Sequence, residues 1–151
     1  DMTQPYIRKA AEWIVAHQNA DGGWGETCAS YMDDSLRGKG PSTASQTGWA
    51  LLALVATSDK EYERTIRRGI GFLIDTQRED GTWDEPYYTG TGFPGYGFGA
   101  RMDFRDQKTR QRIAQGTELQ RGFMINYNLY RHYFPLMAMG RARRFFAEAK
   151  T

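Results

Sequence analysis

Several features that would point to common functions are scarce or missing in this sequence. Cys28 is the only cysteine, so no disulfide can form within the chain. No apolar run approaches the roughly 20 residues that a membrane-spanning helix needs. The formal net charge is only +2, which gives no reason to expect a nucleic-acid partner. Patterns typical of phosphate loops and catalytic triads are also missing.

One stretch of the sequence occurs twice, with matching positions 59 residues apart. Each copy has an amphipathic run, a glutamine, an Asp-Gly turn and a tryptophan. A period of this length is typical of arrays of helical hairpins. We expect the glycine to supply a positive φ, the glutamine amide to bond free backbone groups at a neighbouring helix end, and the indole to pack over it. We therefore interpret these positions as a structural repeat rather than a ligand site: Gln18, Gly22 and Trp24, then Gln77, Gly81 and Trp83.

The hydrophobic periodicity predicts helices that alternate between outer and inner positions. Residues 4–18 and about 61–76 each have one apolar face and are expected to be outer helices. Thr43 and Gln46 resemble a capping box at the start of a helix whose body, 49–56, has no polar face. We expect this inner helix to be covered on all sides by other helices.

The last segment, 126–149, is also helical in pattern, with a break or kink expected at Pro135. The resulting helices are too few to close a ring. We therefore predict an all-α fold that is an open part of an α/α (α6-α6 type) barrel, built from outer and inner helical hairpins. The chain opens at Asp1 directly into a repeat, which suggests a piece of something longer.

Aromatic residues concentrate late in the chain, where 11 of the 21 lie between Tyr87 and Phe134. Most aromatic clusters are core. However, Phe93, Tyr96 and Phe98 occupy glycine-flanked loop positions, where simple packing gains least from a large ring. Rings that line a cavity present negative π faces to a cation and offer no base that would quench it. This pattern favours chemistry with carbocations, such as the cyclisation of a polyene.

The repeat itself resembles the QW repeat of squalene-hopene and oxidosqualene cyclases. The stretch from Trp83 to Gly95 and the motif Tyr130-Arg131-His132 also resemble the C-terminal end of the bacterial squalene-hopene cyclases. The resemblance implies that residues 1–151 form one C-terminal barrel segment of a larger two-domain cyclase, which would convert squalene to hopanoids without a metal or other cofactor. The excursion at about 96–121 departs from the shorter loop of that family.

By the same resemblance, Phe93 and Phe123 match cavity phenylalanines that stabilise the later cations. Tyr127 and Tyr130 match aromatic residues of the cavity wall that contact the substrate. The assignment of Phe123 requires skipping the excursion at 96–121. These four residues are the predicted site.

The Asp-x-Asp-Asp motif, with which these enzymes protonate the substrate, does not occur in the sequence. Asp33 and Asp34 follow Tyr31-Met32 and are interpreted as solvated residues or a turn cap. The initiating acid is therefore expected in an N-terminal part of the enzyme, which would be a partner of this segment. We expect residues 1–151 alone to be inactive.

Two alternatives stay open at this point. A prenyltransferase-like α/α barrel would hold zinc, and Glu26 and Cys28 with His17 or His132 could imitate its ligands. A helical-repeat binding scaffold without catalysis would also explain the repeats. The resemblance further implies that the full-length protein attaches to the cytoplasmic face of the bacterial membrane, and the basic, aromatic segment 141–146 permits such attachment.

Overall fold

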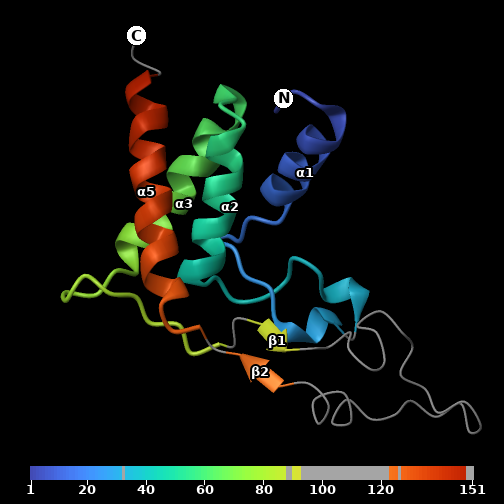
Figure 1. Cartoon of the computed structure of the whole chain (residues 1–151), viewed down its shortest axis with the longest axis vertical. Coiled ribbons are helices and arrows are strands. Elements are labelled where there is room, and N and C mark those ends of the chain that lie inside the picture. The colour runs from blue at the N-terminus through green and yellow to red at the C-terminus, as the bar shows by residue number, and fades with distance from the viewer. Residues whose placement is uncertain (32, 88–89, 93–122, 126, 149–151) are drawn as a thin grey trace, which may run out of the picture. The chain divides into compact units, whose positions relative to one another are not determined.

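The computed structural model describes residues 1–151 apart from 32, 88–89, 93–122, 126 and 149–151. The described chain is mainly helical, which confirms the predicted all-α class (Figure 1). It divides into two compact units. The first unit contains 1–26, 38–86 and 128–151, and the second contains the described residues of 27–37 and 87–127.

Helix α2 lies in the middle of the first unit and contacts each of the three other described α-helices of that unit (Figure 1). In chain order, the helices of this unit are α1 (Pro5–Ala16), α2 (Ala44–Ala56), α3 (Glu63–Asp75) and α5 (Tyr130–Glu148), with a short 3₁₀ turn η3 (Lys60–Tyr62) before α3. Each predicted helix is present, with ends that differ by at most four residues from the prediction.

The outer helices bury one face each, as predicted. On α3, Ile66 and Leu73 are fully buried. On α1, Ala11 is buried and Ile14 is half-buried, while Ala10, which the helical spacing groups with the apolar residues Ile7 and Ile14, is exposed. The buried face of α1 is therefore narrower than its sequence pattern indicated.

The expectation that α2 is covered on all sides is wrong for the described chain. Leu51 and Leu54 are inaccessible to solvent, but Ala53 and Ala56 are exposed and Leu52 is half-buried. Helix α2 therefore has more apolar surface than α1, α3 and α5 cover.

The start of α2 is fixed by Thr43, as predicted. Its hydroxyl accepts the backbone N–H of Gln46 (3.2 Å) and thus caps the helix. The Gln46 amide does not reach back to Thr43, however. It accepts the backbone N–H of Glu26 (2.7 Å) and donates to the Glu26 carbonyl (3.1 Å). The N–H of Thr43 donates instead to Trp24 (2.9 Å), so only half of the predicted capping box forms.

Helix α5 runs through Pro135 as one element, so the chain does not break there, and the other expected outcome, a kink, stays a prediction. The helix begins at Tyr130 rather than near residue 126. Pro135 therefore lies in its second turn and removes a single hydrogen bond, to the carbonyl of Arg131. The segment packs closely on α2. A Cβ at Gly48 would lie 2.8 Å from the carbonyl carbon of Phe134, so only glycine fits there.

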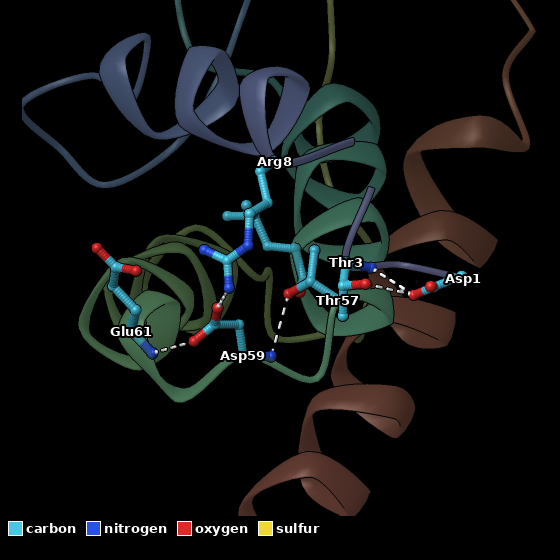
Figure 2. A network of polar contacts seen from close by, with 7 residues as sticks. Asp1, Thr3, Arg8, Thr57, Asp59 and Glu61 are labelled. Atoms are coloured by element: carbon cyan, nitrogen blue, oxygen red, sulfur yellow. Dashed lines mark hydrogen bonds and ion pairs between the residues drawn. The ribbon is translucent and has the colours of Figure 1, made fainter. Parts of the chain in front are cut away.

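The beginning of α1 is tied to the turn before α3 by a polar network around Asp59 (Figure 2). The Asp59 carboxylate accepts from the Arg8 guanidinium (2.8 Å) and from the backbone N–H of Glu61 (2.9 Å). Its own backbone N–H donates to the Thr57 hydroxyl (3.2 Å). These bonds fix the connection from α2 to α3 against the outer helix of the first repeat.

The second unit contains two 3₁₀ turns, η1 (Cys28–Tyr31) and η2 (Asp34–Leu36), and two short strands, β1 (Gly90–Gly92) and β2 (Phe123–Ile125). Asp33 accepts the backbone N–H of Ser35 (2.9 Å), as expected of a turn cap. The strands pair antiparallel with Gly92 opposite Phe123. The chain segments on either side of residues 93–122 therefore lie side by side.

Candidate aromatic site

The glutamines of the two repeated turns make the same local bond. Gln18 Nε2 donates to the carbonyl of Gly22 (2.8 Å), and Gln77 Nε2 donates to that of Gly81 (3.0 Å). Both glycines have the positive φ that the sequence predicted, 92° and 81°. The turns therefore close alike in both copies.

The tryptophans of the two copies also make equivalent hydrogen bonds. The indole N–H of Trp24 donates to the carbonyl of Ile14 in the last turn of α1 (2.7 Å). The indole N–H of Trp83 donates to Leu73 in the last turn of α3 (2.8 Å). Carbonyls at a helix end lack partners within the helix. Each tryptophan therefore caps the outer helix of its own repeat while its ring is buried.

The glutamine of the first repeated turn also bonds to the second repeat. Gln18 Nε2 donates to the carbonyl of Thr65 in the first turn of α3 (3.0 Å), and Gln18 Oε1 accepts from the Arg68 guanidinium (2.9 Å). Arg68 donates to the carbonyls of Asn19 and Ala20 as well. The predicted bond from the glutamine to a neighbouring helix end is thus present in the first copy.

A buried carboxylate holds the N-terminus of α2. Glu85 accepts the backbone N–H of Ser45 (2.9 Å) and its hydroxyl (2.6 Å), and both residues are at most 5 % exposed. The positive end of the helix dipole favours a carboxylate at this position. The inner helix is therefore fixed at its start by the segment that follows the second repeat.

Four aromatic rings meet where α5 begins beside α2. The Tyr130 ring contacts Trp49 of α2 edge to face, with centroids 5.8 Å apart, and contacts Phe134 at 5.1 Å. Trp49 and Phe134 are 5.4 Å apart, and Tyr133 lies 4.5 Å from Phe134. Edge-to-face pairs of this kind stabilise by about 0.5–1.5 kcal/mol each beyond the area they bury. The cluster fixes the orientation of Tyr130, one of the predicted site residues.

The Tyr133 phenol of this cluster is not a base at neutral pH. Desolvation and the neighbouring Tyr130 raise the pKa of Tyr133 above its ordinary value, so its hydroxyl stays protonated. What the rings can offer a ligand is apolar surface and π faces, each worth about 0.5–2 kcal/mol to a cation.

Arg131 connects the start of α5 to the segment after Trp83. Its guanidinium lies 3.5 Å from the Asp84 carboxylate, and its Nε donates to His132 Nε2 (3.3 Å). His132 Nδ1 is buried and has no hydrogen-bond partner among the described residues. Two motifs that are far apart in the sequence, Trp83-Asp84-Glu85 and Tyr130-Arg131-His132, thus meet in one place.

The other predicted site residues are described less completely. Phe93 lies outside the described residues, as does the excursion at 96–121. Phe123 is the first residue of β2. Tyr127 belongs to the second unit and is 49 % exposed. The structure therefore places Tyr130 in an aromatic cluster. Its contact with the substrate stays a prediction, as do the assignments of Phe93, Phe123 and Tyr127.

Trp49, Tyr133 and Phe134 were not among the predicted site residues. On α5 a signal was present, because Tyr130, Tyr133 and Phe134 follow the i, i+3, i+4 spacing that puts side chains on one helix face. Trp49 is separated from them by about 80 residues of sequence, so only the packing of α5 on α2 reveals it.

The ligand group of the zinc alternative is not found in the described part of the chain. There, no three His, Cys, Asp or Glu side chains lie together as a metal ion would require. Within the same residues, no helix combines the length and apolar character needed to cross a bilayer.

Comparison with known proteins gives the family to which this chain is similar. The family described as squalene-hopene cyclase C-terminal domain matches residues 1–105. A squalene–hopene cyclase of Alicyclobacillus acidocaldarius is 47 % identical over 120 residues, which cover 80 % of this chain and 15 % of that protein. A squalene–hopene cyclase of Bradyrhizobium diazoefficiens is 42 % identical over 140 residues, with 92 % of this chain and 17 % of the relative covered.

A further relative carries a different name. A dammaradiene synthase of Dryopteris crassirhizoma is 37 % identical over 150 residues, which cover 91 % of this chain and 18 % of that protein. The chain therefore spans less than a fifth of the length of each of these three relatives. The predicted resemblance is confirmed, and the comparisons support it over the zinc enzyme and the scaffold.

Proposed function

The chain belongs to the squalene-hopene cyclase C-terminal domain family, and we propose that it forms the C-terminal portion of a triterpene cyclase. The substrate is squalene or a related polyprenoid, and the reaction is an isomerisation that yields hopanoids. The relatives named squalene–hopene cyclase support this class, while the dammaradiene synthase shows that a similar segment occurs in a protein named for a different product.

In this proposal the segment stabilises cations and does not start the reaction. The initiating acid belongs to the N-terminal part of the same enzyme, which is consistent with a chain that covers 15 to 18 % of the three relatives named above. Phe93 and Phe123 stabilise the later carbocations, while Tyr127 and Tyr130 contact the substrate. The segment needs no metal and no cofactor for this role.

The observation that carries the proposal is the aromatic cluster around Tyr130. Trp49 and Phe134 hold its ring by edge-to-face contacts, and the raised pKa of the neighbouring Tyr133 keeps that phenol from being an ionised base beside a cation. A carbocation beside such a ring gains about 0.5–2 kcal/mol, which corresponds to about a 2- to 30-fold change in the rate of the step concerned.

The full-length enzyme provides the test. We expect Tyr130→Ala to slow the formation of polycyclic product by about 2- to 30-fold and to raise the share of incompletely cyclised products. Tyr6→Ala is the matched control, because Tyr6 is 71 % exposed on α1. Equal rates and equal product ratios for the two variants would contradict the role of Tyr130. Squalene turnover by residues 1–151 alone would contradict the predicted need for an N-terminal acid.

Attachment to the cytoplasmic face of the membrane belongs to the same proposal. Arg141, Arg143 and Arg144 are exposed near the C-terminal end of α5 and could contact anionic headgroups. Co-sedimentation of the full-length protein with liposomes that contain anionic lipid tests this role. Binding should weaken when the three arginines are replaced by glutamine, and unchanged binding would remove them from the proposal.

A further inference from the structure

The bonds between Glu85 and the start of α2 indicate which kind of element the equivalent glutamate of the first repeat could bind. Glu85 belongs to the second repeat, yet the helix whose start it binds, α2, is the inner helix of the first. Each glutamate after a repeated tryptophan would thus hold the inner helix of the repeat before it. Glu26 occupies the position 59 residues before Glu85, so the same relation directs it to an inner helix that precedes α1.

A hollow lies where such a helix would begin. Its volume is about 240 Å³, and its lining is mostly apolar side chains with Glu26 among them. The wall comes from the end of α1, the first repeated turn and one face of α2: Trp13, Ile14, Trp24, Glu26, Trp49 and Ala50. Ile14, Trp24 and Glu26 are the counterparts of Leu73, Trp83 and Glu85 in the repeat that holds α2.

The face of α2 at this hollow is also uncovered further along the helix. Successive residues of an α-helix are turned by about 100°, so Gln46, Ala50 and Ala53 lie on the side opposite Gly48. Gly48 is where α5 approaches α2. Ala53 is exposed, and the small side chains of Ala50 and Ala53 would allow another helix to come close. Both the hollow and the uncovered side of α2 therefore fit one occupant.

We propose that this surface binds the N-terminal turn of an inner helix that precedes α1, supplied by the part of the enzyme outside residues 1–151. The incoming helix carries a serine or threonine two residues after its N-cap, as α2 does at Ser45. Its backbone N–H and hydroxyl donate to Glu26. The Glu26 carboxylate also accepts the N–H of Gly38 (2.6 Å), so it already binds backbone on the side of the first repeated turn.

This inference rests on the proposal that the chain is part of a longer enzyme, since it needs a preceding repeat. The length of the relatives supports that premise, because the matched region is less than a fifth of each of them. It does not depend on the cyclisation chemistry, and a folding experiment can test it separately.

The repeat allows the missing helix to be supplied from the chain's own sequence. Residues 3 and 62 are equivalent in the two repeats, because they are 59 positions apart. A copy of residues 41–62, joined to residue 4 in place of residues 1–3, therefore keeps the spacing of the repeat. Urea unfolding is then measured for the original and the extended chain, each with and without Glu26→Gln. Glu12→Gln, an exposed carboxylate on α1, is the matched control in both backgrounds.

We expect the extension to raise the unfolding midpoint. Glu26→Gln should lower the folding equilibrium constant of the extended chain by about tenfold more than that of the original chain, as expected for bonds to a buried charged group. Glu12→Gln should affect both equally.

A second variant covers the case in which Glu26→Gln does not fold. Ser45→Ala in the copied segment leaves residues 4–151 unchanged and should remove part of the added stability. An extension that adds no stability, or equal effects of Glu26→Gln in both backgrounds, would overturn the inference. Either result would leave the proposed cyclase function standing, because that function is measured by turnover.

Discussion

Glu85 and Ser45 are joined by two buried hydrogen bonds across 40 residues of sequence. The backbone N–H of Ser45 donates to Oε2 (2.9 Å) and its hydroxyl donates to Oε1 (2.6 Å). A buried carboxylate is costly unless its oxygens are satisfied, and here the start of α2 satisfies both. The segment after the second repeat and the inner helix of the first repeat therefore depend on each other for stability.

Replacing Glu85 by glutamine should be strongly destabilising. The amide NH2 of glutamine is a donor and can only face the Ser45 hydroxyl, which must then accept. Both bonds lose their charged acceptor, and the hydroxyl proton of Ser45 is left without the partner it has in Glu85. We expect a loss of about 2–4 kcal/mol in the free energy of unfolding, measured by urea denaturation. Glu79→Gln, at an exposed position, should change it by less than about 0.5 kcal/mol. Equal effects would show that the carboxylate does not hold α2.

The two repeated glutamines should differ in their contribution to stability although their sequence contexts match. Gln18 bonds to Gly22, Thr65 and Arg68, whereas Gln77 is exposed and bonds to Gly81. We expect Gln18→Ala to lower the free energy of unfolding by about 2–3 kcal/mol and Gln77→Ala by less than about 1 kcal/mol. Urea denaturation of both variants measures the difference. If the two losses are equal, the contacts of Gln18 with α3 do not contribute to the free energy of unfolding.

Local patterns in the sequence predicted the elements well, because they depend on neighbouring residues. The hydroxyl of Thr43, the glycines with positive φ and the amphipathic spacing of α3 act within a few residues of themselves. The repeat added long-range information, since one copy predicts the geometry of the other. This is why the sequence predicted similar structural turns around Trp24 and Trp83.

What the sequence did not show are contacts that depend on how helices meet. A glutamate is usually exposed, so nothing local distinguished the buried Glu85 from its neighbours. Trp49 joins Tyr130 only because α5 packs on α2. The helix does not break at Pro135 for a similar reason, because a proline near the start of a helix removes only one hydrogen bond from a segment that packing holds.

Gly48 should tolerate no side chain, whereas another helical glycine should accept one. A Cβ at Gly48 would meet the backbone of Phe134 at 2.8 Å, and backbone cannot move aside as a side chain can. Gly48→Ala is expected to lower the free energy of unfolding by about 1–3 kcal/mol. Gly140 of α5 has no atom within 4 Å of such a Cβ, so Gly140→Ala should raise it by about 0.5–1 kcal/mol through helix propensity.

Thermal unfolding of the two alanine variants measures these opposite shifts. The comparison is matched because both substitutions add the same methyl group to a helix interior. If Gly48→Ala is stabilising too, α2 and α5 are further apart than the structure shows.

Ser58 offers a site where the chain can be stabilised. It follows the end of α2 with φ 56°, in the left-handed region, and is exposed. Glycine adopts this conformation without steric cost, so Ser58→Gly should raise the free energy of unfolding by about 0.5–1 kcal/mol. Ser58→Ala keeps a Cβ and should give no gain. Thermal unfolding of the two variants decides the point, and a lower midpoint for the glycine variant would contradict it.

Tyr62 should make the stability of the chain fall at high pH. Its ring is 5 % exposed, and burial raises the pKa of its phenol, to which the carboxylates of Glu61 and Asp59 add. The folded state therefore holds the phenolic proton more tightly than the unfolded state does. The resulting stabilisation is complete below the unfolded pKa of about 10 and is lost as the pH rises through the higher folded pKa.

Tyr62→Phe removes the ionisable group while keeping the ring, so it isolates this effect. The difference in the free energy of unfolding between the original chain and Tyr62→Phe should be constant from about pH 7 to 9 and should shift in favour of the variant above about pH 10. Urea denaturation across this range measures it. Tyr6→Phe on the exposed side of α1 is the control and should follow the original chain at every pH. A difference that stays constant up to about pH 11 would mean that the Tyr62 phenol ionises equally well in the folded and unfolded states.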